Sequence, residues 1–188
     1  MNPSPFLIIA AGLERDGRVR AVFSGRSMLP TLRNGMRLLV EKIPPEDVRP
    51  SDIIMYKKGD SIIAHRVIKI IPDGGASVFI TKGDNHAYVD SSYIPREDLM
   101  GIVRSAFIDS DPDRDLLVKS RVTGLLYQAA GNMALAVRKR REDVPKILRS
   151  ILKYFVGGFF FVCKKFIHAV YMGIYHVRLL DQRRAGAF

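Results

Sequence analysis

The chain has 188 residues, of which 47% are hydrophobic and 26% are charged. This composition is typical of a globular protein and excludes collagen-like, disordered and disulfide-scaffold classes. Thirty Lys and Arg against nineteen Asp and Glu leave a net charge of +11, which is typical of proteins that bind nucleic acid or an anionic membrane.

The N-terminal segment and the cysteine content limit targeting and metal chemistry. Residues 1–13 carry no basic residue ahead of a short apolar run at 6–11, so we expect neither a cleavable leader nor a membrane-spanning segment there. The single cysteine, Cys163, has no disulfide partner and lacks the neighbouring ligands that a zinc site needs. The sequence predicts no cofactor and no metal ligand.

Residues 1–114 have the pattern of short strands separated by turns. Six β-branched or aromatic runs are bounded by turn-forming pairs such as Asp16-Gly17 and Asn34-Gly35, which supply positive φ angles or Asx turns. The runs are 18–24, 36–41, 52–56, 61–71, 77–82 and 100–108. Short strands at this spacing predict a mainly β domain with a coiled antiparallel sheet.

After residue 114 the turn signals thin out and an apolar period of three to four residues begins. The apolar residues of this period are Val122, Leu126, Ala129, Met133 and Val137. This period predicts a helix that ends in the basic run 138–141, where Pro145 separates it from a second helix at 146–180. Gly157-Gly158 marks a place for that helix to kink or split. We therefore expect a β domain over 1–114 and a basic amphipathic helical extension over 115–188.

Three stretches of the β half carry groups that catalysis can use. Ser27 follows a strand and precedes a proline-fixed turn, which exposes its hydroxyl at a bend, although serines in turns more often bond to the local backbone. His65 lies within a strand on its inner face, as either a structural hydrogen-bonding residue or a general base. Asp84 and Asp90 follow the strand at 77–82, and either carboxylate could fix the tautomer of a histidine.

A series of motifs in this half resembles, in content and order, the signal peptidase I superfamily, which also contains the LexA-type self-cleaving repressors. The resemblance covers residues 18–108 and includes Ser-Met-Leu-Pro-Thr-Leu (27–32), Leu-Leu-Val (38–40), Asp-Ile-Ile-Met-Tyr (52–56), Ala-His-Arg-Val-Ile (64–68), Thr-Lys-Gly-Asp-Asn (81–85) and Gly-Ile-Val (101–103). Bacterial leader peptidases and LexA-type proteins use a serine–lysine dyad. The endoplasmic-reticulum and archaeal type has histidine instead of that lysine, and His65 makes this type the nearest.

The resemblance implies a serine endopeptidase with Ser27 as nucleophile, His65 as general base and an aspartate that orients the histidine. Asp90 matches the position of the family's acid, and Asp84 is then a supporting residue. Ser27 would form an acyl-enzyme that water resolves, with its own backbone N–H as an oxyanion donor. Lys82 is the alternative base, but it lies in the Lys-Gly-Asp motif and not at the dyad position.

The chain departs from the superfamily pattern at several positions. Many members have a serine two residues before the nucleophile as a second oxyanion donor, and here that position is Gly25. Gly35-Met36 and Ser51-Asp52 stand where Gly-Asp pairs are usual, which affects local turns more than catalysis. Signal peptidases also have N-terminal membrane anchors, and we expect none at the start of this chain.

The positive charge gathers near the C-terminus. Residues 138–184 hold twelve basic and three acidic residues, which accounts for nine of the eleven net charges. The apolar stretches of this region are too short to span a bilayer. They form a wide apolar helix face with basic flanks, which predicts an interfacial helix on an anionic membrane. This implies a peripheral location at the cytoplasmic side of a membrane. The alternative is that the face packs on the β domain or on a second copy of the chain.

The expected partner in catalysis is a peptide or a preprotein, with a preference for small residues before the cut that comes only from the resemblance. Nucleic acid is disfavoured, because neither a known reader motif nor stacking aromatic residues accompany the charge. Two alternatives remain on the same β scaffold. One is a LexA-like module that cleaves itself, which the absence of a DNA-binding region and of a lysine at position 65 disfavours. The other is a non-catalytic binding protein.

Overall fold

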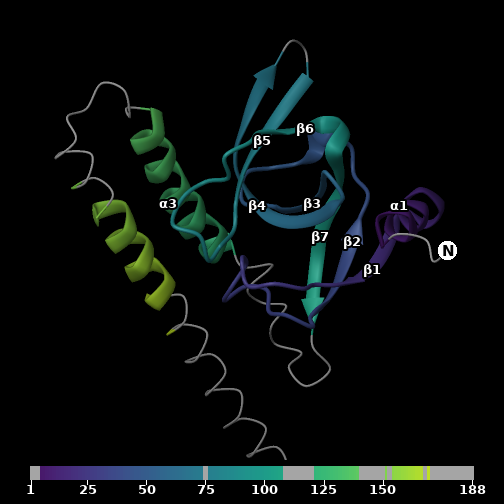
Figure 1. Ribbon diagram of the computed structural model, residues 1–188, viewed down its shortest axis with the longest axis horizontal. Coiled ribbons are helices and arrows are strands. Elements are labelled where there is room, and N and C mark those ends of the chain that lie inside the picture. The colour runs from purple at the N-terminus through teal and green to yellow at the C-terminus, as the bar shows by residue number, and fades with distance from the viewer. Residues whose placement is uncertain are drawn as a thin grey trace, which may run out of the picture.

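A seven-stranded antiparallel sheet forms the centre of the protein, which confirms the predicted mainly β fold class. The computed structural model describes residues 5–73, 76–107, 121–139, 151, 154–166 and 169. The strands lie in the order β1-β2-β7-β3-β4-β5-β6 and coil around the core (Figure 1). Their bounds are β1 Arg18–Val22, β2 Arg37–Glu41, β3 Ile53–Lys58, β4 Ser61–Asp73, β5 Ala76–Lys82, β6 Ile94–Pro95 and β7 Leu99–Phe107.

Each of the six predicted runs corresponds to one strand of this sheet, and the short β6 is an addition. Turn chemistry explains the hairpins. The two-residue turn between β3 and β4 begins at Gly59, whose φ of 59° lies in the left-handed region that favours glycine. Three helices of the β half were not predicted: α1 (Pro5–Asp16) and the 3-10 turns η1 (Pro45–Asp47) and η2 (Arg96–Asp98).

Strand β4 is the best buried part of the sheet and positions the site. Its central residues 64–68 are all buried. Strands β3 and β5 pair with its two edges, and helix α3 (Arg121–Lys139) packs against it. One apolar cluster of the core lies under β1, β2, β3 and β7, and a second lies between β3, β4, β5 and β6. A side chain held on β4 therefore has little freedom to move.

Helix α3 confirms the first predicted helix and docks closely on β4. A Cβ atom on Gly131 would lie 2.6 Å from Ile68 Cγ2, so only glycine permits this approach without a shift. Ser51 Oγ, just before β3, donates a hydrogen bond of 3.0 Å to the Gln128 side chain. The expected domain boundary at 114/115 lies outside the described residues.

A second helix covers residues 154–166, within the range predicted for it, and it continues through Gly157-Gly158 without a break. The rest of the predicted range 146–180 lies outside the described residues, apart from 151 and 169. Val156, Phe160 and Cys163 are buried, so one side of this helix packs on the protein. Its other side exposes large apolar residues, namely Tyr154, Phe155, Phe159, Phe161, Val162 and Phe166. Among the helices that the structure describes, none has both the length and the apolarity needed to cross a membrane.

Candidate active site

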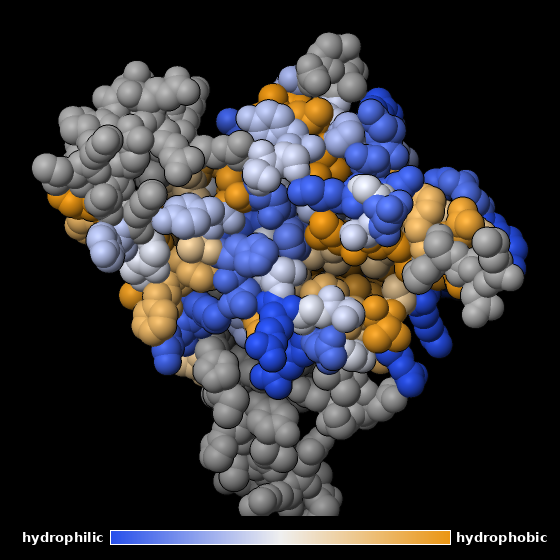
Figure 2. Space-filling model, in the orientation of Figure 1, coloured by the Kyte–Doolittle hydropathy of each residue, from blue (hydrophilic) through white to orange (hydrophobic). Residues whose placement is uncertain are grey.

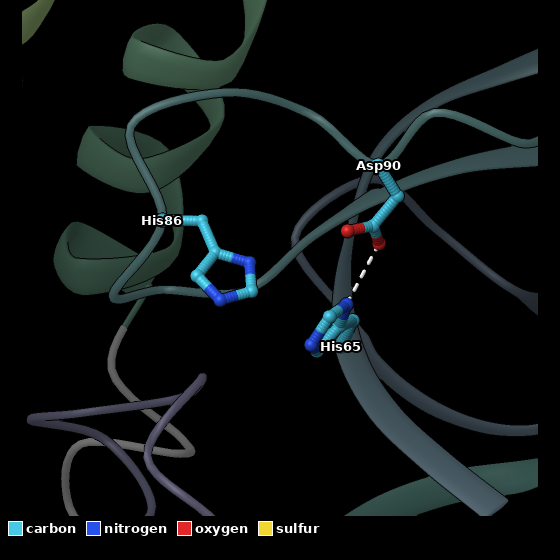
Figure 3. Close-up of side chains that lie close together, drawn as sticks. All are labelled: His65, His86 and Asp90. Carbon is cyan, nitrogen blue, oxygen red and sulfur yellow. Dashed lines mark hydrogen bonds and ion pairs between the residues drawn. The ribbon is translucent and has the colours of Figure 1, made fainter. Parts of the chain in front are cut away.

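His65 lies in the middle of β4, opposite Ile54 of β3, and its side chain is almost completely buried. Its Nδ1 atom lies 2.7 Å from Asp90 Oδ2 (Figure 3). With the proton on Nδ1, the ring donates to the carboxylate and leaves Nε2 as a proton acceptor. The structure thus brings together two of the predicted site residues in the arrangement that a general base needs.

Asp90 is fixed by the strand that precedes it in sequence. Its backbone N–H donates to the Thr81 carbonyl of β5 at 2.9 Å, and Thr81 Oγ1 donates to Asp90 Oδ2 at 2.6 Å. Tyr56 of β3 adds a longer hydrogen bond of 3.4 Å. Burial alone would raise the pKa of Asp90, but the hydrogen bonds and the charge of the neighbouring histidines outweigh it and lower that pKa. The carboxylate is therefore ionised at neutral pH.

Asp84 has a different environment, although it lies only six residues earlier. It is completely buried and accepts two hydrogen bonds from the Arg66 guanidinium, at 2.8 and 2.7 Å. Thr31 Oγ1 donates a third at 2.5 Å. Arg66 also donates to the Ser51 carbonyl at 2.7 Å. Asp84 thus ties the loop after β5 to the segment after Ser27 and to Arg66 of β4.

Ser27 lies at the start of a turn, half-buried, beside the loop that carries the aspartates. The backbone N–H of Asn85 donates to the Ser27 carbonyl at 2.7 Å. Gly83 lies between the Ser27 segment and His65. A Cβ atom added to Gly83 would be 2.6 Å from the Ser27 carbonyl oxygen and 3.1 Å from His65 Nε2, so these two atoms both lie close to Gly83. Among the described residues, the structure records no hydrogen bond between the Ser27 hydroxyl and His65.

Lys82, the alternative base, donates a hydrogen bond of 3.3 Å from Nζ to the Gly83 carbonyl. Thr81 and Lys82 are successive residues of β5, so their side chains lie on opposite faces of the sheet. Lys82 Nζ is 5.5 Å from the Tyr127 ring and 4.5 Å from the Phe160 ring, both in the helical extension. Burial, together with the charge of Arg66, lowers the pKa of Lys82 to about 8.

His86 lies beside His65 and Asp90, although the sequence motifs did not predict it as a site residue. Its ring centroid lies 5.5 Å from that of His65, with the two ring planes nearly perpendicular (Figure 3). Partial burial, followed by the charge of His65, lowers the pKa of His86. The available signal was its place in the loop between the two candidate aspartates.

An apolar groove of about 360 Å³ runs beside the site, where α1 approaches the sheet. Ala64 and Ile62 of β4 form one wall, next to His65 in the chain, and Phe23 and Ser24 lead towards Ser27. Phe6 and Ile9 of α1 close the groove on another side. Figure 2 shows this face as a hollow with apolar walls among polar surroundings. Its lining suits an extended segment with small or apolar side chains.

Comparisons with known proteins agree with the motifs at a coarse level. No family model matches the chain. Over 83 residues the chain is 31% identical to a protein described as Signal peptidase I W, from Bacillus subtilis (strain 168), and the match covers 43% of this chain and 43% of that protein. The chain therefore spans less than half the length of this curated relative. The similarity supports the signal peptidase superfamily and a peptidase-like function.

Proposed function

We propose that the chain is a serine endopeptidase of the signal-peptidase type, belonging to the type that has histidine in place of lysine. The observation that carries the proposal is the 2.7 Å contact between His65 Nδ1 and Asp90, on a buried strand next to the Ser27 segment. Asp90 holds the imidazole in one tautomer and stabilises the imidazolium that forms during reaction.

In the proposed reaction, the Ser27 hydroxyl loses its proton to His65 Nε2 while Oγ attacks the carbonyl carbon of the scissile peptide bond. The Ser27 backbone N–H stabilises the oxyanion. When the tetrahedral intermediate breaks down, the C–N bond breaks and His65 gives its proton to the leaving amine. A water molecule, deprotonated by His65, then hydrolyses the ester and restores Ser27.

The proposed substrate is a peptide or preprotein with small residues before the cut, bound in the groove beside α1. Since β1 is an edge strand of the sheet, its outer side can offer backbone groups for pairing with an extended substrate. The basic helical extension, which has exposed aromatic residues, would hold the enzyme at an anionic membrane surface, where preproteins are presented.

A nucleophile variant tests the proposal directly. Ser27→Ala should abolish cleavage of a preprotein whose signal sequence ends in small residues, with a loss of at least about a thousandfold in kcat. Ser92→Ala, on an exposed loop, is the matched control and should cleave at the wild-type rate. Full cleavage by Ser27→Ala would remove the serine mechanism. Mass analysis of the purified wild type distinguishes cleavage of added substrate from cleavage of its own chain.

The structure also gives support to a second candidate, a non-catalytic binding module on the same scaffold. Within the described part of the chain, Ser27 Oγ and His65 share no recorded hydrogen bond. If the wild type and Ser27→Ala both fail to cleave but bind the same peptide with equal affinity, the groove binds peptides without cleaving them.

A further inference from the structure

Three side chains of the site offer donor atoms that suit a transition-metal ion. One ring nitrogen of His65, one ring nitrogen of His86 and one carboxylate oxygen of Asp90 lie within 4.8 Å of one another. Figure 3 shows His86 on the loop, with its ring directed towards the His65–Asp90 pair. Two imidazoles and a carboxylate are a common ligand set of Zn²⁺, which then takes a water molecule at the fourth position.

The spacing is close to what such an ion requires. Bonds of about 2.0 Å at tetrahedral angles place ligand atoms about 3.3 Å apart, so the widest pair must approach by roughly 1.5 Å. His65 is on a buried strand and Asp90 is anchored to β5, whereas His86 is exposed on the loop. The movement therefore falls on the side chain that has room to make it.

The surroundings keep this space open and hold the carboxylate in place. A Cβ atom on Gly83 would lie 2.9 Å from His86 Nδ1 and 3.1 Å from His65 Nε2, so a side chain there would intrude between the two rings. Thr81 Oγ1 and Tyr56 OH donate to Asp90 Oδ2, as outer partners of metal-binding carboxylates do. The nearby Arg66 charge is paired with Asp84, and the Lys82 ammonium is held at the Gly83 carbonyl and over the Tyr127 ring.

We propose that His65, His86 and Asp90 bind a divalent transition-metal ion of the zinc type, and that the bound ion reversibly blocks peptide cleavage. A metal-bound imidazole nitrogen has no lone pair for a proton, and an ion between His65 and Asp90 replaces their hydrogen bond. The blocking effect rests on the proposed peptidase function, whereas the binding site does not. His86 is then a residue of regulation, outside the acyl-transfer steps.

Calorimetry separates binding from activity. Titrating ZnCl₂ into the full-length Ser27→Ala protein should show a site with one ion per chain, because this variant keeps all three ligands. Adding His86→Asn to that protein should weaken the site at least about tenfold, since a ligand is lost. His176→Asn in the same background removes a histidine elsewhere and should leave the affinity unchanged. Equal zinc affinity with and without His86, or no zinc binding, would overturn the site.

The effect on cleavage is measured as a ratio within each protein. Zinc should lower the cleavage rate of the wild type, a chelator should restore it, and the ratio of rates with and without zinc should be closer to one in His86→Asn. Equal inhibition of both proteins would overturn the proposed block. A wild type that never cleaves any peptide would instead overturn the proposed function, and calorimetry would still decide the metal site.

Discussion

Asp84 and Asp90 are separated by six residues, yet they have different partners. Asp84 neutralises the fully buried Arg66, and Asp90 contacts His65. A carboxylate that neutralises a buried cation contributes to stability, whereas one that fixes a histidine tautomer contributes to rate. The same substitution at the two positions should therefore have two different effects.

Asp90→Asn should lower kcat by at least about a hundredfold with a small change in stability, because the amide favours the wrong tautomer of His65. Asp84→Asn should cost about 3–5 kcal/mol in the free energy of unfolding, because the Arg66 charge is left buried without its partner. Urea unfolding and preprotein cleavage, measured on both variants, check the pair. An Asp84→Asn protein with wild-type stability would contradict the structural role given to the Arg66 pair.

Lys82 gives the stability a pH dependence that can be isolated. Burial lowers the pKa of Lys82 to about 8 in the folded protein, from an ordinary value of 10.5. Between these values the unfolded chain binds more protons than the folded one, so raising the pH stabilises the folded state. From pH 7 to about pH 10 the free energy of unfolding of the wild type should rise by roughly 2–3 kcal/mol relative to that of Lys82→Met, because this variant has no titrating group at position 82. Urea unfolding of both proteins at each pH measures the gain, and a difference independent of pH would contradict it.

At the scale of elements, the strands were predictable because β-branched runs alternate with glycine-containing turns. Helix α1 was missed because its sequence, with few polar residues, has no helical period to distinguish it from a strand or a loop. The helix at 154–166 lies in the range 146–180, where mostly basic residues at helical spacing form a narrow stripe in an otherwise apolar segment and predict a helix. The sequence left open whether its apolar face packs on the protein. The structure places Phe160 against Lys82 and leaves Phe155 exposed. Only one side of this helix therefore packs on the protein.

The candidate site was predictable as far as motifs reach. Ser27, His65 and the two aspartates were selected by motif order, but the partner of His65 depends on how the loop after β5 folds back to Thr81. That path is set by contacts between distant segments, such as the Asn85 N–H with the Ser27 carbonyl. The nearness of His86 to His65 depends on the same path. Periodicity and spacing carry no information about it.

Two glycines test how the helices are held. Gly131→Ala should destabilise the protein by about 1–3 kcal/mol, because the new Cβ would lie 2.6 Å from Ile68 on buried β4. Gly157→Ala is the matched control in the other helix, where nothing lies within 4 Å of the new Cβ. There alanine should stabilise by up to about 1 kcal/mol through its helix propensity. Urea unfolding of both variants should give changes of opposite sign, and equal changes would contradict the docking of α3 on β4.

For the whole molecule, charge and exposed apolar surface coincide at the C-terminal end. Residues 138–184 carry nine of the eleven net charges, and the helix at 154–166 within them exposes aromatic side chains on the side that does not pack. Its Lys164 also donates a hydrogen bond of 2.5 Å to Asn85 in the site loop. A surface bound at this helix would therefore lie close to the segment that holds Ser27.

Vesicle flotation tests the role of this region with the full chain. The protein should float with vesicles that contain phosphatidylserine and remain behind with phosphatidylcholine alone, because each basic residue near an anionic surface contributes about 1 kcal/mol. Replacing the four basic residues 138–141 by glutamine should weaken binding at least tenfold. The matched control replaces four exposed basic residues of the β domain, Arg18, Arg20, Lys58 and Lys69, which leaves the same net charge. If the two variants float equally well, total charge and not the helical extension directs binding. If the wild type floats with neither vesicle, the exposed aromatic side has another partner, such as a second copy of the chain.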